Sequence, residues 1–294
     1  MPDALVSLHG TIVPAAQATV PALDRGLLYG DGVFEVLRTY RGAPFALEEH
    51  LGRLHASAAR IGLSLPVPIS RLRAEVALLV DAAGFGEAHL RVLVTRGVGD
   101  PGVAPANARD PTRMIVAHPL HAPPRERYER GVRVAGVRVG SLEPLAGAKT
   151  LNYLANVVWT QQARAQGFDD ALLVGAGDLV IEAATANVFV VHGRAVRTPA
   201  LDGGALPGVT RAFVLRCARA AGFEATEGRV TLADVWTADE VFLTSSVREI
   251  VPVVAVDDHE VGTGAPGSVT RAIHRAYRAE TPLAGAPMPW EPTP

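Results

Sequence analysis

A single lysine stands out among the residues that could perform chemistry. Lys149 is the only lysine in this chain of 294 residues, because every other member of the 28 lysine and arginine positions is arginine. A lysine amine can form a Schiff base with a carbonyl group where its surroundings favour the neutral form. The same residue could equally be an exposed lysine without such a role. Its position after Leu145-Ala-Gly-Ala, where a helix is predicted to begin, favours a side chain that faces a cleft.

Three further stretches carry groups that bind charged or polar ligands. Glu182 follows a predicted strand at residues 179–181, either as an acceptor for a ring N–H group or as an exposed acid. Residues 206–211, Leu-Pro-Gly-Val-Thr-Arg, place a glycine turn before a helix, whose N–H groups can bind an anion or merely form a cap. Residues 244–246, Thr-Ser-Ser, offer hydroxyl groups or form a polar turn. A lysine, an acid and an anion site are what pyridoxal 5′-phosphate (PLP) requires.

Composition and the remaining motifs exclude several classes of protein. The formal net charge of −2 arises from 28 basic and 30 acidic residues that are mixed along the chain, so no nucleic-acid partner is expected. Cys217 is the only cysteine and cannot form an internal disulfide. No metal site is expected, because His50 and His55 point to different helix faces and no His-Glu-x-x-His motif occurs. The start of the chain lacks a signal peptide and no apolar run approaches the roughly 20 residues of a membrane span, which predicts a cytoplasmic protein.

The first part of the chain predicts an α+β domain. Turn signals separate expected strands at residues 5–8, 11–13, 33–40, 44–47, 90–95 and 114–117. Apolar residues recur at helical spacing from Leu51 to Ala58 and again from Leu72 to Val80. Arg53 lies off the first apolar stripe, where either a solvated face or a phosphate contact would suit it. Residues 97–111, rich in Gly, Pro and Asn, form a long loop that we expect to border the site.

Prolines at residues 118–124 predict a break between two domains. The expected division is an N-terminal α/β domain at residues 1–118, an interdomain linker at 119–126 and a C-terminal PLP-binding α/β domain at 127–294. Strands are expected at residues 131–139, 171–174, 179–181, 188–191, 195–197, 241–243 and 251–256. Helices are expected at residues 210–221 and 268–279, and another is expected to carry Leu151, Leu154, Ala155, Val158 and Trp159 on one stripe. The proline-rich end from residue 284 is expected to fray.

Six stretches, taken in chain order, resemble the fold type IV PLP enzymes. This group contains branched-chain aminotransferases, D-amino acid aminotransferases and 4-amino-4-deoxychorismate lyases. The stretches are residues 24–38, 49–54, 149–153, 182–189, 206–211 and 242–246, and the resemblance spans residue 5 to about residue 275. It implies a two-domain α+β or α/β architecture with the cofactor between the domains. It also implies a class IV aminotransferase that works as a homodimer, in which a neighbouring subunit helps to build each active site.

The resemblance carries roles to particular residues. Lys149 would hold PLP as a Schiff base and move the proton at the substrate Cα, and Glu182 would keep the pyridine nitrogen protonated. The residues implied to hold the phosphate are Arg53, Val209, Thr210 and Ser246. Further positions implied to contact the cofactor are Tyr153, Asn187, Leu206 and Ser245.

The resemblance leaves the substrate open. Residues 31–40 and 50–61 most resemble D-amino acid aminotransferases, yet residues 98–103 lack the arginine–x–histidine pair of the well-known members of that group. Arg91 instead matches an arginine shared with branched-chain enzymes, and Tyr153 matches the position where those enzymes place a tyrosine near the cofactor hydroxyl. The candidates for substrate contact are Tyr29, Phe34, Arg38, Arg91 and Arg96; Arg38 and Arg96 serve either as carboxylate anchors or as structural residues.

The predicted activity is transfer of an amino group between an amino acid, of D-amino acid or branched-chain type, and a 2-keto acid by a ping-pong mechanism. One alternative within the fold is the lyase that releases 4-aminobenzoate and pyruvate. Another is an (R)-amine transaminase, which would suit the missing anchor pair. A non-catalytic PLP-binding protein is the alternative from a different class, but such a protein would not need both Lys149 and Glu182.

Overall fold

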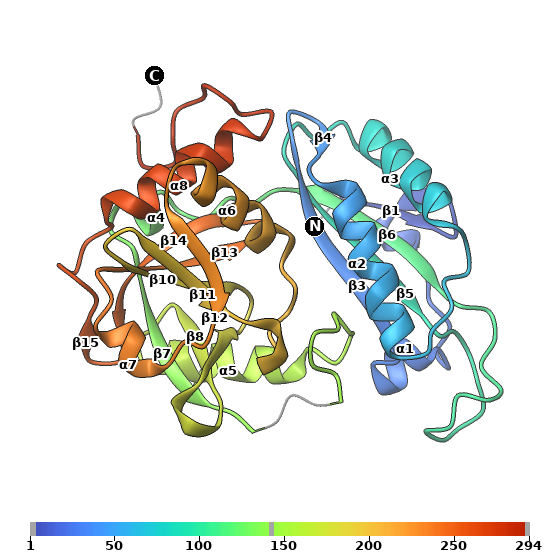
Figure 1. Cartoon of the computed structure of the whole chain (residues 1–294). Helices are drawn as coiled ribbons and strands as arrows, with labels where there is room; N and C mark the ends of the chain where they lie inside the picture. Colours follow the sequence, from blue (N-terminus) through green and yellow to red (C-terminus); the bar gives the residue numbers. More distant parts are fainter. Residues whose placement is uncertain (1–3, 141–143, 292–294) are drawn as a thin grey trace. The chain divides into compact units, whose positions relative to one another are not determined.

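The computed structural model describes residues 4–140 and 144–291, and these form two compact units (Figure 1). Unit 1 consists of residues 4–121 together with the short segment 148–153. Unit 2 consists of the remaining described residues, from 122 to 147 and from 154 onward. The domain limits expected from the sequence, with a linker at residues 119–126, stay a prediction.

Unit 1 is built on an antiparallel sheet with the strand order β2-β1-β6-β5-β3-β4. Its strands are β1 Leu5–Leu8, β2 Thr11–Pro14, β3 Gly32–Tyr40, β4 Ala43–Pro44, β5 Ala88–Thr95 and β6 Arg113–Pro119. The predicted hairpin of the first two strands is confirmed. Strand β3 is long and buried along nearly its whole length, so residues on both of its faces have packing partners.

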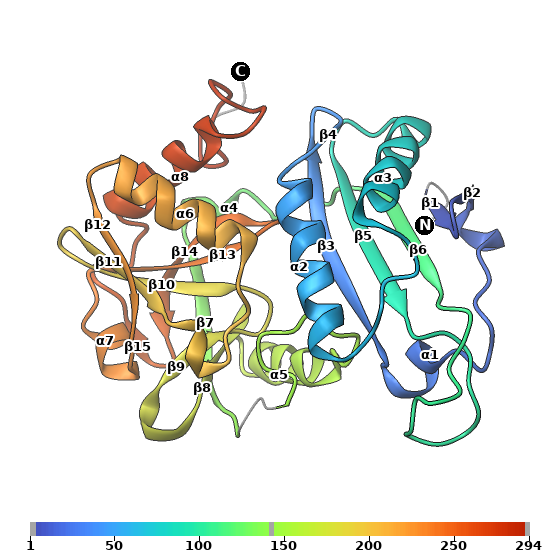
Figure 2. The ribbon, with the colours of Figure 1, turned by 45° about the vertical axis from the view of Figure 1, so that its right-hand side comes forward.

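Helices α2 (Leu47–Arg60) and α3 (Ile69–Ala83) cover one face of this sheet (Figure 2). The predicted apolar stripes are confirmed, since Leu51 and Leu54 of α2 and Leu72 and Val76 of α3 are fully buried against the strands. The short helix α1 (Arg25–Tyr29) precedes β3, and a 3₁₀ turn occupies Ala15–Gln17. The strand predicted at residues 44–47 is mostly wrong, because Ala46 adopts a left-handed conformation (φ 53°) and α2 begins at Leu47.

The segment 148–153 pairs with β3 instead of starting a helix. The N–H of Phe34 donates to the carbonyl oxygen of Lys149, and the N–H of Leu151 donates to the carbonyl oxygen of Gly32. The helix predicted around Leu151 is wrong at its start, since α5 runs from Leu154 to Ala165. The reason is that β4 pairs only with the far end of β3, so the backbone groups at residues 32–34 need another partner.

Unit 2 contains a second, mixed sheet with the order β12-β11-β10-β13-β14-β7-β8-β9, and β15 pairs with β14. Its strands are β7 Val132–Arg138, β8 Asp170–Val174, β9 Val180–Ala183, β10 Asn187–His192, β11 Ala195–Pro199, β12 Glu224–Gly228, β13 Glu240–Ser245, β14 Glu249–Val256 and β15 His259–Glu260. The predicted hairpins β8–β9 and β10–β11 are confirmed. Strand alternation buries Leu172 and Val188 in one apolar cluster, while Leu173 joins a second cluster.

Helices surround this sheet. They are α4 Glu126–Glu129, α5 Leu154–Ala165, α6 Val209–Ala220, α7 Leu232–Trp236 and α8 Ser268–Ala279, with 3₁₀ turns at Ala176–Asp178 and Leu201–Gly203. The stripe predicted for α5 is only partly confirmed, because Trp159 packs against the core whereas Leu154 is 73% and Val158 40% exposed. Fraying from residue 284 is wrong for the described residues up to 291, where Trp290 packs against the core. Residues 292–294 lie outside the described residues.

Candidate active site

Lys149 lies at the edge of β3 in unit 1, above two aromatic rings. Its backbone N–H donates to Oγ of Ser57 at 3.0 Å. Its Nζ atom is 4.4 Å from the centroid of the Phe34 ring and 5.3 Å from that of Tyr153. The two rings meet edge to face with their centroids 5.2 Å apart. Such faces attract an ammonium group and shield one side of the amine from water.

The buried carboxylate of Glu35, on β3, binds two residues of α2. Arg53 donates from Nε and Nη2 to the two Glu35 oxygens, each at 2.7 Å, and His50 Nδ1 lies 2.7 Å from Oε2. Burial opposes ionisation of Glu35, but Arg53 and His50 outweigh it and lower its pKa from 4.5 to about 2. Burial is also the main cause of the lowered pKa of His50. The solvated alternative for Arg53 is wrong, since its side chain is 9% exposed.

In unit 2, Glu182 of β9 is held by two N–H donors. Its Oε2 accepts hydrogen bonds from Nδ2 of Asn187 at 3.1 Å and from the backbone N–H of Leu206 at 3.0 Å. Asn187 also donates to the carbonyl oxygen of Leu206 at 2.9 Å, which ties β10 to the segment before α6. Glu182 is therefore an oriented, half-buried carboxylate and not the exposed acid of the alternative interpretation.

The start of α6 has the features of an anion site. Gly208 is its N-cap without a side-chain cap, and a Cβ there would lie 1.9 Å from Oδ1 of Asn187, so only glycine fits. Val209 and Thr210, the first helical residues, are buried. Thr244 faces the same side as its cross-strand partner Asn187, and its buried Oγ1 has no hydrogen-bond partner among the described residues. A buried hydroxyl and the N–H groups of a helix start fit a phosphate.

The long loop at residues 97–111 is ordered at its base. Val98 and Arg109 exchange two backbone hydrogen bonds of 2.9 and 2.8 Å, and Gly97 accepts the N–H of Arg25 at 2.8 Å. Gly97 has φ +85°, and a Cβ there would lie 2.1 Å from the carbonyl oxygen of Arg109. The base of the loop therefore continues the backbone hydrogen bonding of the sheet.

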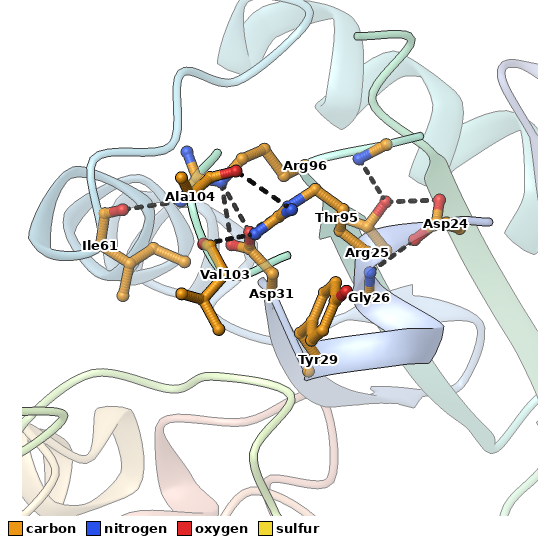
Figure 3. Close-up of polar contacts among 12 residues, drawn as sticks. Asp24, Arg25, Gly26, Tyr29, Asp31, Ile61, Thr95, Arg96, Val103 and Ala104 are labelled. Carbon is orange, nitrogen blue, oxygen red and sulfur yellow. Dashed lines mark hydrogen bonds and ion pairs between the residues drawn. The ribbon is translucent and has the colours of Figure 1, made fainter. Parts of the chain in front are cut away.

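The tip of this loop is bound by Arg25 of α1 (Figure 3). The guanidinium donates to the carbonyl oxygens of residues 102, 103 and 104 at 3.0, 2.9 and 3.4 Å, and Nε donates to Asp31 at 2.9 Å. The N–H of Gly102 donates to Oη of Tyr29, whose ring lies 4.9 Å from the Arg25 guanidinium carbon. One buried arginine thus joins the loop tip to a candidate substrate residue.

Asp31 connects Arg25 to Arg96 in the same view (Figure 3). Arg96 donates from Nε to both Asp31 oxygens at 2.9 Å and from its terminal nitrogens to the carbonyl oxygens of Ile61 and Gly62 at 2.8 Å. Burial opposes ionisation of Asp31, but the two arginines lower its pKa. No sequence pattern indicated Arg25 or Asp31, because only the folded chain brings Arg96 and the loop carbonyl groups to them.

Comparison with known proteins identifies this chain. The model of the amino-transferase class IV family matches residues 32–256. The chain belongs to the class IV aminotransferase family. It is 35% identical over 277 residues to a putative branched-chain-amino-acid aminotransferase of Methanocaldococcus jannaschii, covering 93% of this chain and 95% of that protein. It is 33% identical over 274 residues to the D-alanine aminotransferase of Bacillus licheniformis, covering 93% and 95%.

A solved relative extends this result to the fold and the cofactor. The T.th. branched-chain amino acid aminotransferase with pyridoxamine 5′-phosphate superposes with a TM-score of 0.89 at 28% identity, covering 97% of this chain and 96% of that one. This class IV aminotransferase is therefore a PLP-dependent enzyme with the mixed α/β, two-sheet architecture of fold type IV. The family, fold and cofactor predicted from the six motifs are confirmed.

The residues of this class IV aminotransferase fit PLP chemically. Lys149 supplies the only side-chain amine, and Glu182 supplies an oriented carboxylate for a ring nitrogen. The start of α6, which has no side-chain cap, and the Thr244 hydroxyl suit a phosphate. Among the described residues there is no group of three or more metal-ligating side chains and no helix long and apolar enough to cross a membrane.

The candidate substrate residues of the aminotransferase have different surroundings in unit 1. The Arg91 guanidinium carbon lies 4.1 Å from the Phe34 ring centroid, and burial lowers its pKa. Arg38 forms an ion pair with Glu87 and lies over the Tyr40 ring. Arg96 is bound as described above. The ion pairs of Arg38 and Arg96 support a structural role for both residues instead of a role as carboxylate anchors. Arg91 and Lys149 both contact the ring of Phe34.

Proposed function

We propose that this aminotransferase acts on amino acids and 2-keto acids of the branched-chain type. The observation that carries the proposal is the cluster of Lys149, Phe34, Tyr153 and Arg91, in which the amine and the guanidinium both lie against the Phe34 ring. Tyr153 and Arg91 are the two positions that resemble branched-chain enzymes. The cluster offers an apolar surface for an aliphatic side chain and a cation for a carboxylate.

Particular residues would hold the cofactor. Lys149 is the proposed covalent attachment point, and Glu182, oriented by Asn187 and Leu206, would accept the ring N–H. The residues proposed for the phosphate are Arg53, Val209, Thr210, Ser245 and Ser246. Bound PLP supplies an electron sink for the carbanion at the substrate Cα.

Lys149 is also the proposed base that removes the proton at the substrate Cα and returns one in the second half-reaction. Aromatic faces by themselves attract the charged ammonium form of Lys149. The rings beside its Nζ would favour the neutral amine only by excluding water from it. Because the first product leaves before the second substrate binds, the kinetics are expected to be ping-pong.

D-alanine is the second candidate substrate. It is favoured by the Bacillus licheniformis relative, at nearly the same identity as the branched-chain relative. Against it stands the loop at residues 98–103, which carries no arginine or histidine and whose tip side chain Val103 is apolar and 86% exposed. A tip of this kind supplies no charge for a small substrate carboxylate.

A homodimer is part of the proposal. Leu23, Leu27 and Leu28, in and just before α1, are 59, 68 and 49% exposed. Exposed leucines gathered in one short segment are typical of surfaces that a second subunit covers. A solution mass near the monomer value of 30.9 kDa would contradict the dimer.

The visible absorbance spectrum of the purified holoenzyme tests the substrate. L-leucine, added without an acceptor, is expected to convert the PLP band to that of the pyridoxamine form, and D-alanine is expected to leave it unchanged. Conversion by D-alanine alone would replace the branched-chain proposal by the D-amino acid one. A PLP band that neither amine changes would favour the lyase alternative.

A further inference from the structure

The turn between β13 and β14 ends in a residue with an unusual backbone conformation, Glu249. Ser245, the last residue of β13, pairs with Glu249, the first residue of β14. Glu249 has φ +58°, in the left-handed region, although it carries a long side chain. A residue other than glycine, asparagine or aspartate is rare in this region and stays there only where its surroundings hold it.

The side chain of Glu249 is held by helix α8. It is 1% exposed, and Oε2 accepts from Nε of Arg278 at 2.7 Å and lies 2.7 Å from Nε2 of His274. Oε1 accepts a second bond from Nη2 of Arg278 at 3.3 Å. Burial opposes ionisation of this carboxylate, but His274 and Arg278 outweigh it and lower its pKa. The strained end of the turn is thus tied to a helix by a buried ionic cluster.

The neighbouring residue, Arg248, ties the other side of the turn to the sheet. Its Nη1 donates to Asp170 of β8 at 2.7 Å, and its Nη2 donates to Oγ1 of Thr185, which follows Glu182 by three residues, at 2.8 Å. Its Nε donates to Oγ of Ser245 at 3.3 Å. Its carbonyl oxygen accepts the hydroxyl of Tyr128 at 3.0 Å. Residues 245–249 are therefore fixed from two directions.

We infer that Glu249 is a positioning residue for the cofactor phosphate: bound to His274 and Arg278 of α8, it holds the turn that presents Ser245 and Ser246. The inference rests on the proposed assignment of these two serines to the phosphate. Glu249 itself, buried against α8, touches neither cofactor nor substrate in this role. Without its ionic contacts the left-handed conformation loses its support, and the serine hydroxyl groups lose their fixed direction.

The chain offers a matched control at the opposite end of the same helix. Glu240 caps the start of α8, where its Oε1 and Oε2 accept the backbone N–H groups of Val269 and Thr270 at 2.9 and 2.7 Å. Glu249→Gln and Glu240→Gln make the same chemical change against the same helix. Both substitutions are expected to lower the melting temperature. Only Glu249→Gln is expected to change the conformation of residues 245–249.

The decisive measurement compares the dissociation constants of PLP and of pyridoxal, which lacks the phosphate, for wild type and both variants. Glu249→Gln is expected to weaken PLP binding about tenfold or more while leaving pyridoxal binding unchanged. Glu240→Gln is expected to change neither constant. The inference is overturned if Glu249→Gln weakens the binding of PLP and of pyridoxal equally. It is also overturned if the dissociation constant of PLP is the same for Glu249→Gln as for Glu240→Gln.

Arg278→Met serves as a second variant if Glu249→Gln does not fold. That change removes two of the bonds to Glu249 and leaves His274 in place. The same expectation and the same overturning result apply to it. A wild-type enzyme that binds PLP no more tightly than pyridoxal would instead overturn the phosphate assignment on which the inference rests, irrespective of the substrate.

Discussion

The Arg25 guanidinium donates to the carbonyl oxygen of Val103 at 2.9 Å, although 78 positions separate the two residues in the chain. The bond joins α1 to the tip of the loop at residues 97–111, and the same guanidinium binds the carbonyl oxygens on either side. A charged donor that is 3% exposed and bound to three consecutive carbonyl groups holds one backbone conformation. The loop is therefore ordered by a residue outside it.

Replacing this arginine should release the loop. In Arg25→Met, amide hydrogen exchange at residues 99–108 is expected to be at least about tenfold faster, because several charge-assisted bonds are lost. Arg219→Met is the control, since Arg219 donates to a single carbonyl oxygen, that of Ala225 in unit 2. Unchanged exchange in the loop of Arg25→Met would show that the base alone keeps the loop ordered.

The pKa of Glu35 predicts a dependence of stability on pH. Its folded-state pKa of about 2 lies below the usual 4.5, so its contribution is fully present above about pH 5 and is lost as the pH falls toward 2. The lost free energy of unfolding is on the order of 3 kcal/mol. Urea unfolding at several pH values should therefore give a smaller decrease for Glu35→Gln than for wild type over this range.

The control for Glu35 is the exposed Glu48, which forms an ion pair with Arg73 at the surface. Glu48→Gln should follow the wild-type curve, because solvent screens such pairs. Glu249 also has a lowered pKa and acts in the same direction, so the difference between each variant and wild type is the informative quantity. Parallel curves for Glu35→Gln and wild type would contradict the role of the Glu35 cluster.

Gly208 is expected to tolerate no side chain. In Gly208→Ala the new Cβ meets Oδ1 of Asn187 and pushes away the amide that orients Glu182, at a cost of about 2 to 3 kcal/mol of stability. PLP affinity should fall as well. Gly52→Ala in α2 has open space around its Cβ and is expected to stabilise by about 0.5 to 1 kcal/mol. Equal effects of the two changes, measured by urea unfolding, would refute this account of the turn.

Because Lys149 is the only lysine, its proposed bond to the cofactor can be located directly. Borohydride reduction of the holoenzyme, followed by trypsin and mass spectrometry, is expected to place one cofactor adduct on the peptide spanning residues 139–164. Lys149→Arg keeps the positive charge but offers no nucleophilic amine, so it should give no adduct and no turnover. An adduct found only on the N-terminal amine would rule out the assignment.

Local patterns in the sequence determined much of this protein. Six motifs in order sufficed for the family, the fold type and the cofactor, and turn residues between apolar runs predicted the hairpins β1–β2, β8–β9 and β10–β11. The glycine before α6 was equally readable, because its turn and the helix after it are specified by neighbouring residues.

Only the tertiary structure decided where distant partners meet. The segment around Lys149 has the pattern of a helix start, yet it is extended, because the unpaired edge of β3 supplies hydrogen bonds that no local pattern encodes. The sequence alone was compatible with either a solvated Arg53 or a phosphate contact. In the structure Arg53 is bound to Glu35, 18 positions earlier in the chain. No local pattern indicated the role of Arg25 in the loop, since the three carbonyl oxygens that it binds there lie more than 70 positions away. Charge pairing and strand-edge pairing depend on distance in space, whereas the sequence displays only distance along the chain.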